Sequence, residues 1–124
     1  MDMTSSQPYL LRAIYEWIAD NDMTPYVLVN AEMENIEVPR QYIENGKIVL
    51  NLSATAVSNL QLLNDYIMFN ARFAGKAMEV SFPVAAVLAI YAKENGQGMV
   101  FNEESNPAPP EPEKPSGPSL KLVK

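Results

Sequence analysis

Cysteine and histidine are both absent from the 124-residue sequence, and each absence excludes a class of chemistry. Without cysteine there is no disulfide framework and no thiol nucleophile. Without histidine the chain lacks the most frequent general base and the most frequent metal ligand. Glycine occurs only five times and forms no glycine-rich phosphate-binding loop. No basic-then-apolar leader and no apolar run of membrane-spanning length occurs, so we expect a cytoplasmic protein with no membrane partner.

The acidic residues do not suggest an active site. Acid–base catalysis needs two carboxylates held together in a cleft, whereas Glu32, Glu34 and Glu37 are expected to share one solvated loop. Serine hydrolysis lacks its histidine partner, and no lysine is spaced near a serine motif. We therefore expect no enzyme, no metal site and no cofactor.

Charge is distributed unevenly along the chain, whose formal net charge is −6. Residues 1–104 carry 6 Lys/Arg and 13 Asp/Glu, whereas residues 105–124 carry 3 Lys and 2 Glu. An acidic body repels phosphate backbones. Direct DNA binding is therefore not expected, and RNA binding is disfavoured.

Two runs between Lys47 and Phe73 predict strands. The first covers residues 47–53 and follows Asn45-Gly46, a strong tight-turn signal. The second covers residues 66–73 and alternates regularly, with Ile67, Phe69, Ala71 and Phe73 on an apolar face and Tyr66, Met68, Asn70 and Arg72 on the other. The second face suits ligand binding, although an ordinary half-exposed strand has the same pattern. Small residues nearby would leave room for a ligand backbone: Ser53, Ala54 and Ala56.

A helix is predicted over residues 9–19, with Pro8 at an early helical position and Ser5 or Ser6 as its cap. Its polar stripe is narrow, and most of its circumference is apolar: Leu10, Leu11, Ile14, Tyr15, Trp17 and Ile18. A helix lying on one sheet buries a stripe of about 100°. The surplus apolar surface therefore needs a second cover, which is either the rest of the fold or a second copy of the chain.

The remaining elements of the body are short. Strands are predicted at residues 26–30, 36–38, 78–82 and 98–101. The continuous apolar run of the first indicates either burial on both faces or an inner position. Residues 84–92 follow Pro83 and are rich in alanine, which predicts a short buried helix. Residues 59–65 fit either a helical turn or a strand with a turn.

Composition changes sharply after Phe101. Residues 102–118 hold six of the ten prolines among polar residues, which predicts a disordered linker. Residues 119–124 are aliphatic and basic, as short linear motifs are, although a chain end without a function can have the same composition. The predicted organisation is thus a body at 1–101, a linker at 102–118 and a terminal motif at 119–124.

Six blocks of sequence, taken in order, closely resemble one known family. They are residues 8–13, 16–17, 24–26, 48–53, 69–73 and 88–96. The family is stringent starvation protein B (SspB), a group of bacterial proteolysis adaptors, and the likeness spans residues 7–101. The C-terminal Leu-Lys-Leu-Val-Lys resembles the family's protease-docking motif.

The resemblance implies an α+β fold, in which an N-terminal helix precedes a small, two-sheet, partly open Sm-like β-barrel. It also implies a homodimer built largely through the first helix, which would explain the surplus apolar surface. Carried onto this sequence, the dimer interface would involve Leu11, Ile14, Tyr15 and Ile18.

The resemblance further implies a peptide-binding adaptor. Its groove would take the ssrA degradation tag added to chains on stalled ribosomes, and its C-terminus would dock on the N-terminal zinc-binding domain of the ClpX unfoldase, for degradation by ClpXP. Ribosome association is another property described for the family. The groove would have Ser53, Ala54 and Ala56 on one side and Asn70, Ala71, Arg72 and Phe73 on the other; docking would involve Leu120, Lys121, Leu122, Val123 and Lys124. The alternative is an Sm-like RNA-binding or ribosome-associated protein, which the acidic body disfavours.

Overall fold

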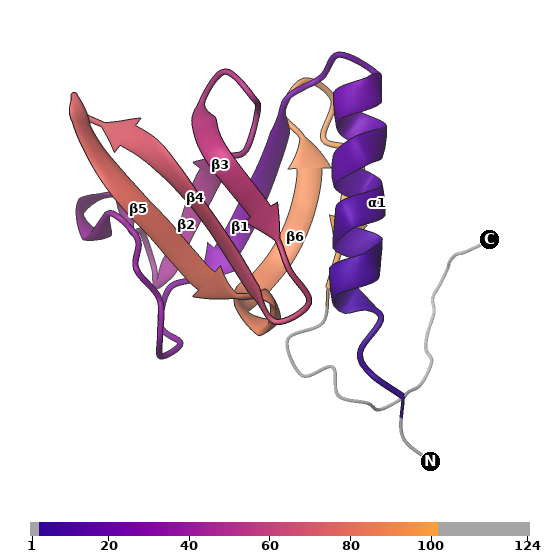
Figure 1. The fold of residues 1–124 in the computed structure, drawn as a ribbon, viewed down its shortest axis with the longest axis horizontal. Coiled ribbons are helices and arrows are strands. Elements are labelled where there is room, and N and C mark those ends of the chain that lie inside the picture. The colour runs from indigo at the N-terminus through magenta and orange to yellow at the C-terminus, as the bar shows by residue number, and fades with distance from the viewer. Residues whose placement is uncertain (1–2, 102–124) are drawn as a thin grey trace.

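The computed structural model describes residues 3–101, which form one α-helix and two antiparallel sheets (Figure 1). The first sheet has the strand order β2-β1-β6-β7 and the second has the order β3-β4-β5. The elements in chain order are α1 (Gln7–Asp20), β1 (Pro25–Asn30), η1 (Arg40–Tyr42), β2 (Lys47–Asn51), β3 (Val57–Leu62), β4 (Tyr66–Phe73), β5 (Lys76–Pro83), η2 (Val84–Ala86), β6 (Val87–Ala92) and β7 (Gly98–Val100). The sheets do not close into one barrel, so the expected α+β, partly open architecture is confirmed. The expected linker and terminal motif lie outside the described residues.

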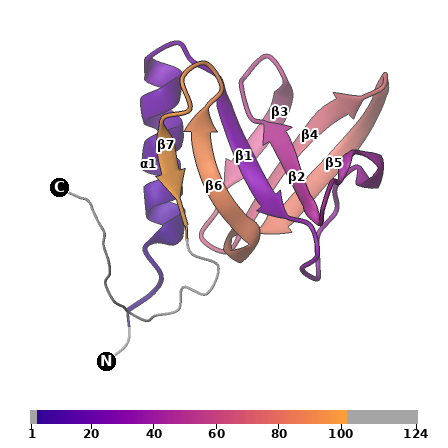
Figure 2. The same ribbon diagram turned by 180° about the vertical axis from the view of Figure 1, so that it is seen from behind.

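Helix α1 begins where the sequence predicts. Pro8 lies in its first turn, and the backbone N–H of Gln7 donates to Ser5 Oγ at 3.1 Å. The helix stands beside β6 and β7 in both views (Figures 1 and 2). Arg12 ties it to the second sheet, because its guanidinium donates to the Leu62 carbonyl oxygen and to Asn64 Oδ1, both at 2.9 Å. The helix therefore braces the two sheets against each other.

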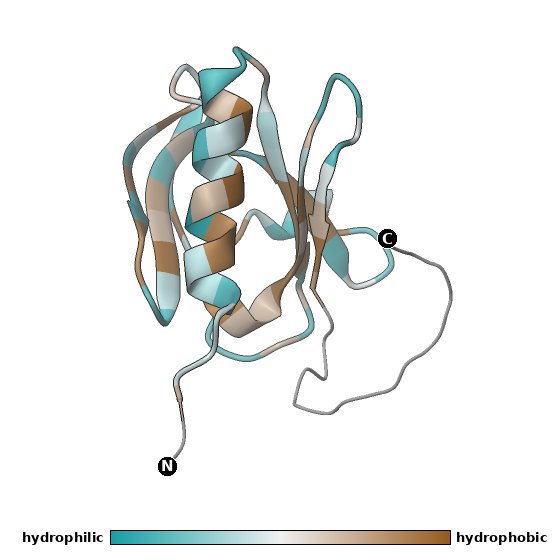
Figure 3. Cartoon of the chain, turned by 90° about the vertical axis from the view of Figure 1, so that its right-hand side faces the viewer, coloured by the Kyte–Doolittle hydropathy of each residue, from teal (hydrophilic) through white to brown (hydrophobic). Residues whose placement is uncertain are grey.

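The core lies between the sheets and under α1. Val27 and Val29 of β1 are fully buried, as expected for the inner strand that lies between β2 and β6. From the second sheet, Phe69 and Phe82 pack edge to face with ring centroids 6.4 Å apart. Hydrophobic segments alternate with polar ones along the strands (Figure 3), which is the period expected of sheets with one face turned inward.

Two tight turns set the register of the hairpins. Asn45 and Gly46 both have positive φ, at 54° and 76°, as a two-residue hairpin turn requires. Glu44 and Lys47 accordingly exchange backbone hydrogen bonds of 2.8 and 3.0 Å. The expected connection between β4 and β5 is likewise made by Ala74 and Gly75.

The prediction of a helix at residues 84–92 is wrong. The segment forms the short η2 turn and then β6, which pairs with β1 on one side and with β7 on the other. Hydrogen bonding on both sides outweighs the helical propensity of its alanines, and the valine and isoleucine between them suit a strand. Residues 36–38 form no strand and make one isolated bridge, Glu37 to Ser81. The undecided segment 59–65 contains most of β3 and the turn after it.

Candidate functional site

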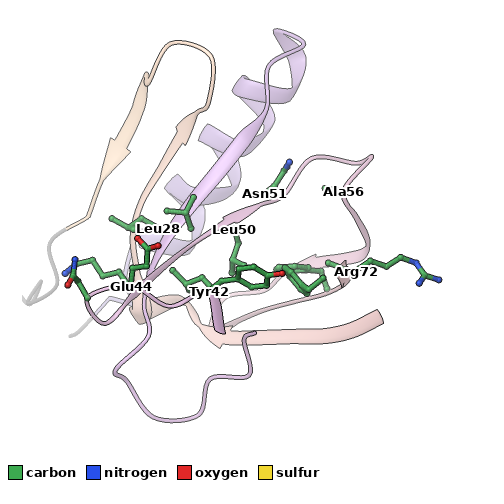
Figure 4. Close-up of a pocket in the computed structure, with 14 residues that line it drawn as sticks. Leu28, Tyr42, Glu44, Leu50, Asn51, Ala56 and Arg72 are labelled. Carbon is green, nitrogen blue, oxygen red and sulfur yellow. The ribbon is translucent and has the colours of Figure 1, made fainter. Parts of the chain in front are cut away.

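A cavity of about 730 Å³ opens between β2 of the first sheet and the end of β4 in the second (Figure 4). All five residues of β2 line it, together with Leu28 of β1. The other lining residues are Tyr42, Glu44 and Asn45 from the segment before β2, Ala56 from the loop after it, and Phe69, Ala71, Arg72 and Phe73 of β4. Three stretches far apart in the sequence thus meet at one site.

The cavity has an apolar floor and a charged rim. Ile48, Leu50 and Phe69 are buried and present aliphatic and aromatic surface to it. Lys47 and Arg72 are exposed at its edges. An apolar cavity with a few polar groups at its margins is the usual form of a ligand site.

An aromatic pair closes one part of the cavity wall. Tyr42 is the last residue of η1 and Phe73 is the last residue of β4, and their ring centroids lie 5.8 Å apart at an angle of 42°. The Tyr42 side chain is 46% exposed, so a ligand can reach its ring. The pair joins the segment before β2 to the second sheet.

Arg72 lies at the mouth of the cavity. Its guanidinium Nη1 donates to the Gly75 carbonyl oxygen at 3.1 Å, within the β4–β5 turn. Figure 4 shows the side chain extended away from the middle of the cavity. Because this bond is exposed, the guanidinium can exchange it for an acidic ligand group at little cost.

The structure brings together some of the residues expected at the groove and leaves others apart. Ala56, Ala71, Arg72 and Phe73 all line the cavity, whereas Ser53, Ala54 and Asn70 are not among its lining residues. Asn70 lies between Phe69 and Ala71 in sequence, so its side chain is on the opposite face of β4. Arg72 shares that face, and of the two only Arg72, next to the end of the strand, lines the cavity. The Ser53 backbone N–H donates to Asn51 Oδ1 at 2.8 Å within the loop after β2.

Sequence reasoning missed most of the cavity wall from the first sheet. Leu28, Tyr42, Glu44 and the residues of β2 line it, and none of these was expected there. Tyr42 carried a weak signal, as an aromatic side chain in an otherwise polar segment. Residues 48–51 of β2 fall in a block that resembles the family, but their place beside the cavity depends on the strand order, which makes β2 an edge strand.

The four helix residues expected at a dimer interface have two different environments. Leu11 and Ile18 are 1% and 2% exposed and pack into the chain's own core. Ile14 and Tyr15 are partly buried against that core. The apolar side chains that α1 exposes are instead Tyr9, Leu10 and Trp17. The expected docking residues 120–124 lie outside the described part of the chain.

Two further features of residues 3–101 bear on function. No cluster of three or more acidic side chains there could hold a metal ion. None of the helices described is both long and apolar enough to cross a membrane.

Fold and cavity together define an α+β domain with a groove open beside a sheet edge. The family model for stringent starvation protein B matches residues 5–122. A relative from Haemophilus influenzae, described as a stringent starvation protein B homolog, is 55% identical over 98 residues. That alignment covers 79% of this chain and 65% of the relative. The chain belongs to the stringent starvation protein B family.

Proposed function

We propose that this protein is a non-enzymatic proteolysis adaptor of the cytoplasm. Its cavity would bind ssrA-tagged polypeptides, and its C-terminal residues would tether them to the ClpX unfoldase for degradation by ClpXP. Family membership supports the general role. The single observation that carries tag binding is the cavity beside β2, with its apolar floor and exposed cations. A homodimer formed through α1 and an association with ribosomes belong to the same proposal.

An extended peptide suits this cavity better than a compact ligand does. The lining follows β2 along its whole length, which at about 3.3 Å per residue is about 17 Å. Lys47 and Arg72 outnumber Glu44 among the charged lining residues, although the whole chain has a net charge of −6. The site therefore favours a neutral or acidic segment over a basic one.

Tag binding is tested by the fluorescence anisotropy of a labelled ssrA-type peptide. We expect saturable binding by the intact protein and about tenfold weaker binding by Arg72→Ala, since a charge-assisted hydrogen bond contributes about 1.5 kcal/mol. The matched control is Lys93→Ala, which removes the same charge from an exposed position just after β6, outside the cavity, and should bind like the parent protein. A folded protein that does not bind the peptide would overturn the proposal.

Delivery to the protease is tested by removing residues 120–124. We expect ClpXP to degrade a tagged substrate no faster with the truncated protein than without it. Peptide affinity should stay unchanged, because the cavity is built entirely from residues 28–73. If peptide affinity falls together with delivery, the binding and docking functions are not separate and the two-part scheme is wrong.

A further inference from the structure

The first sheet ends at the cavity in a strand that has one free side. Strand β2 pairs with β1, and within residues 3–101 it has no second neighbour, as the sheet order β2-β1-β6-β7 shows. A strand of this kind presents a row of backbone N–H and C=O groups without partners. Such a row can bind an extended chain by forming one more strand.

The register of β2 identifies which groups are free. Leu52 N–H donates to the Pro25 carbonyl oxygen at 2.8 Å, and Ala31 N–H donates to that of Gly46 at 2.7 Å. In an antiparallel pair, the residues that bond to a given neighbour alternate with those that face away from it. The even-numbered residues of β2 therefore bond to β1, and Lys47, Val49 and Asn51 face the free edge.

Only two of these three residues are available. The N–H and C=O of Lys47 are both bonded to Glu44 across the Asn45-Gly46 turn. Val49 and Asn51 follow, and no backbone hydrogen bond on their free side is found among residues 3–101. The Asn51 side chain oxygen accepts from the Ser53 N–H at 2.8 Å, in the loop after β2. Two donors and two acceptors thus face the cavity side of β2.

The other sheet edges do not offer the same site. No residue of β3 lines the cavity, and its pairing with β4 is interrupted between Ser58 and Gln61. The edge of β5 is partly covered, because Ser81 exchanges backbone hydrogen bonds of 2.7 and 3.0 Å with Glu37. β7 has three residues and lies outside the cavity. Among the described strands, β2 alone combines a free edge with a ligand-sized cavity.

We infer that the substrate tag binds by adding a strand to β2, with its main chain hydrogen-bonded to Val49 and Asn51. This inference rests on the proposed function, and it specifies how the tag is held. Because side chains alternate along a strand, every second tag residue faces Phe69 and Ala71 inside the cavity. The intervening residues lie beside the exposed Val49 side chain. Main-chain pairing supplies affinity for any extended segment, and the inward side chains supply the selection.

The test is a scan of ssrA-type peptides in which one backbone nitrogen at a time carries a methyl group. Methylation removes a donor and places bulk where β2 would pair, so we expect binding to weaken about tenfold or more at two positions that are two residues apart. Methylation at the residue between them, whose N–H points away from β2, should change affinity less than twofold. Uniform effects at all three positions, with the unmodified peptide bound normally, would overturn the inference and leave the proposed function intact. No binding of the unmodified peptide would overturn both.

A protein variant tests the same bond from the other side. Val49→Pro removes a single N–H on the free side of an edge strand, a position where proline is tolerated. We expect this variant to bind the peptide about tenfold more weakly than Val49→Ala, which loses the side chain and keeps the N–H. Thermal unfolding identifies any loss of fold. Equal affinity of the two folded variants would contradict pairing at Val49.

Discussion

At the scale of single residues, Tyr42 contributes a ring to the cavity. It contacts Phe73 at a centroid distance of 5.8 Å, and no hydrogen bond of its hydroxyl group is found within residues 3–101. We expect Tyr42→Phe to bind an ssrA-type peptide as the parent does. Tyr42→Ala should bind about fivefold more weakly, because a contact between this exposed ring and the ligand would contribute about 1 kcal/mol. Anisotropy titrations of both variants check this. Weak binding by Tyr42→Phe would show that the hydroxyl group matters instead.

Glu94 shows how one exposed carboxylate can make stability depend on pH. Its two oxygens accept from the Thr24 N–H at 2.9 Å and from Thr24 Oγ1 at 2.7 Å, and these bonds lower the pKa of the Glu94 carboxyl. A pKa that is lowered on folding adds stability above the pKa of the unfolded chain, and this stability is lost as pH falls through the folded pKa. We therefore expect Glu94→Gln to be less stable than the parent at pH 7, with the difference shrinking in acid. Urea unfolding of both proteins at pH 7 and pH 3 measures it, and a difference that grows in acid would contradict it.

At the scale of elements, α1 has large apolar side chains that its own sheets leave uncovered. Leu10 and Trp17 lie seven residues apart on the same helical face, and both are exposed. If a second copy covers this face, Trp17→Glu should give a monomer that still folds and binds peptide, because Trp17 lies outside the cavity. Sedimentation equilibrium measures the mass. Ala19→Glu is the matched control, since it places the same charge on the polar side of α1, and it should leave the mass unchanged.

The elements that could be predicted from the sequence are those with an unambiguous local pattern. β4 has an apolar face of Ile67, Phe69, Ala71 and Phe73 that alternates with a mixed face, and its predicted bounds agree with the structure. α1 and the Asn45-Gly46 turn likewise have specific start or turn signals. β6 has none, because alanine mixed with valine and isoleucine fits a buried helix as well as a buried strand. Its pairing with β1 and β7 decides the outcome, and that pairing is a property of the whole sheet.

At the scale of the whole molecule, the cavity could be predicted only in part. Ala56 was expected at the site as a small residue that leaves room for a ligand backbone, and the end of β4 because residues 69–73 form one of the blocks that resemble the family. Tyr42 and β2 enter it because the two sheets meet without closing, which places the β2 edge opposite Phe73. Asn70 was expected there as a polar group, but the cavity is lined by the inward-facing Phe69, Ala71 and Phe73 and, from the face of Asn70, by Arg72 alone. The alternation pattern predicts which side chains of a strand share a face. Which of these side chains line a cavity depends on how the two sheets pack.

The first sheet also lies between the cavity and the point where the described part of the chain ends. β2 and its cavity form one edge of the row of strands, and β7 forms the other (Figure 2). Three strand spacings of about 4.8 Å, or about 14 Å in all, lie between them. The chain passes Phe101 just after β7, so everything that follows in the sequence starts at the edge remote from the cavity. Two ligands at separate sites are coupled only when both prefer the same one of two conformations of the protein. A rigid sheet between the sites would leave them uncoupled. The unfoldase would then bind an adaptor that carries a substrate no more tightly than an empty adaptor. The fraction of docked adaptors that carry a substrate would depend only on how abundant the substrate is.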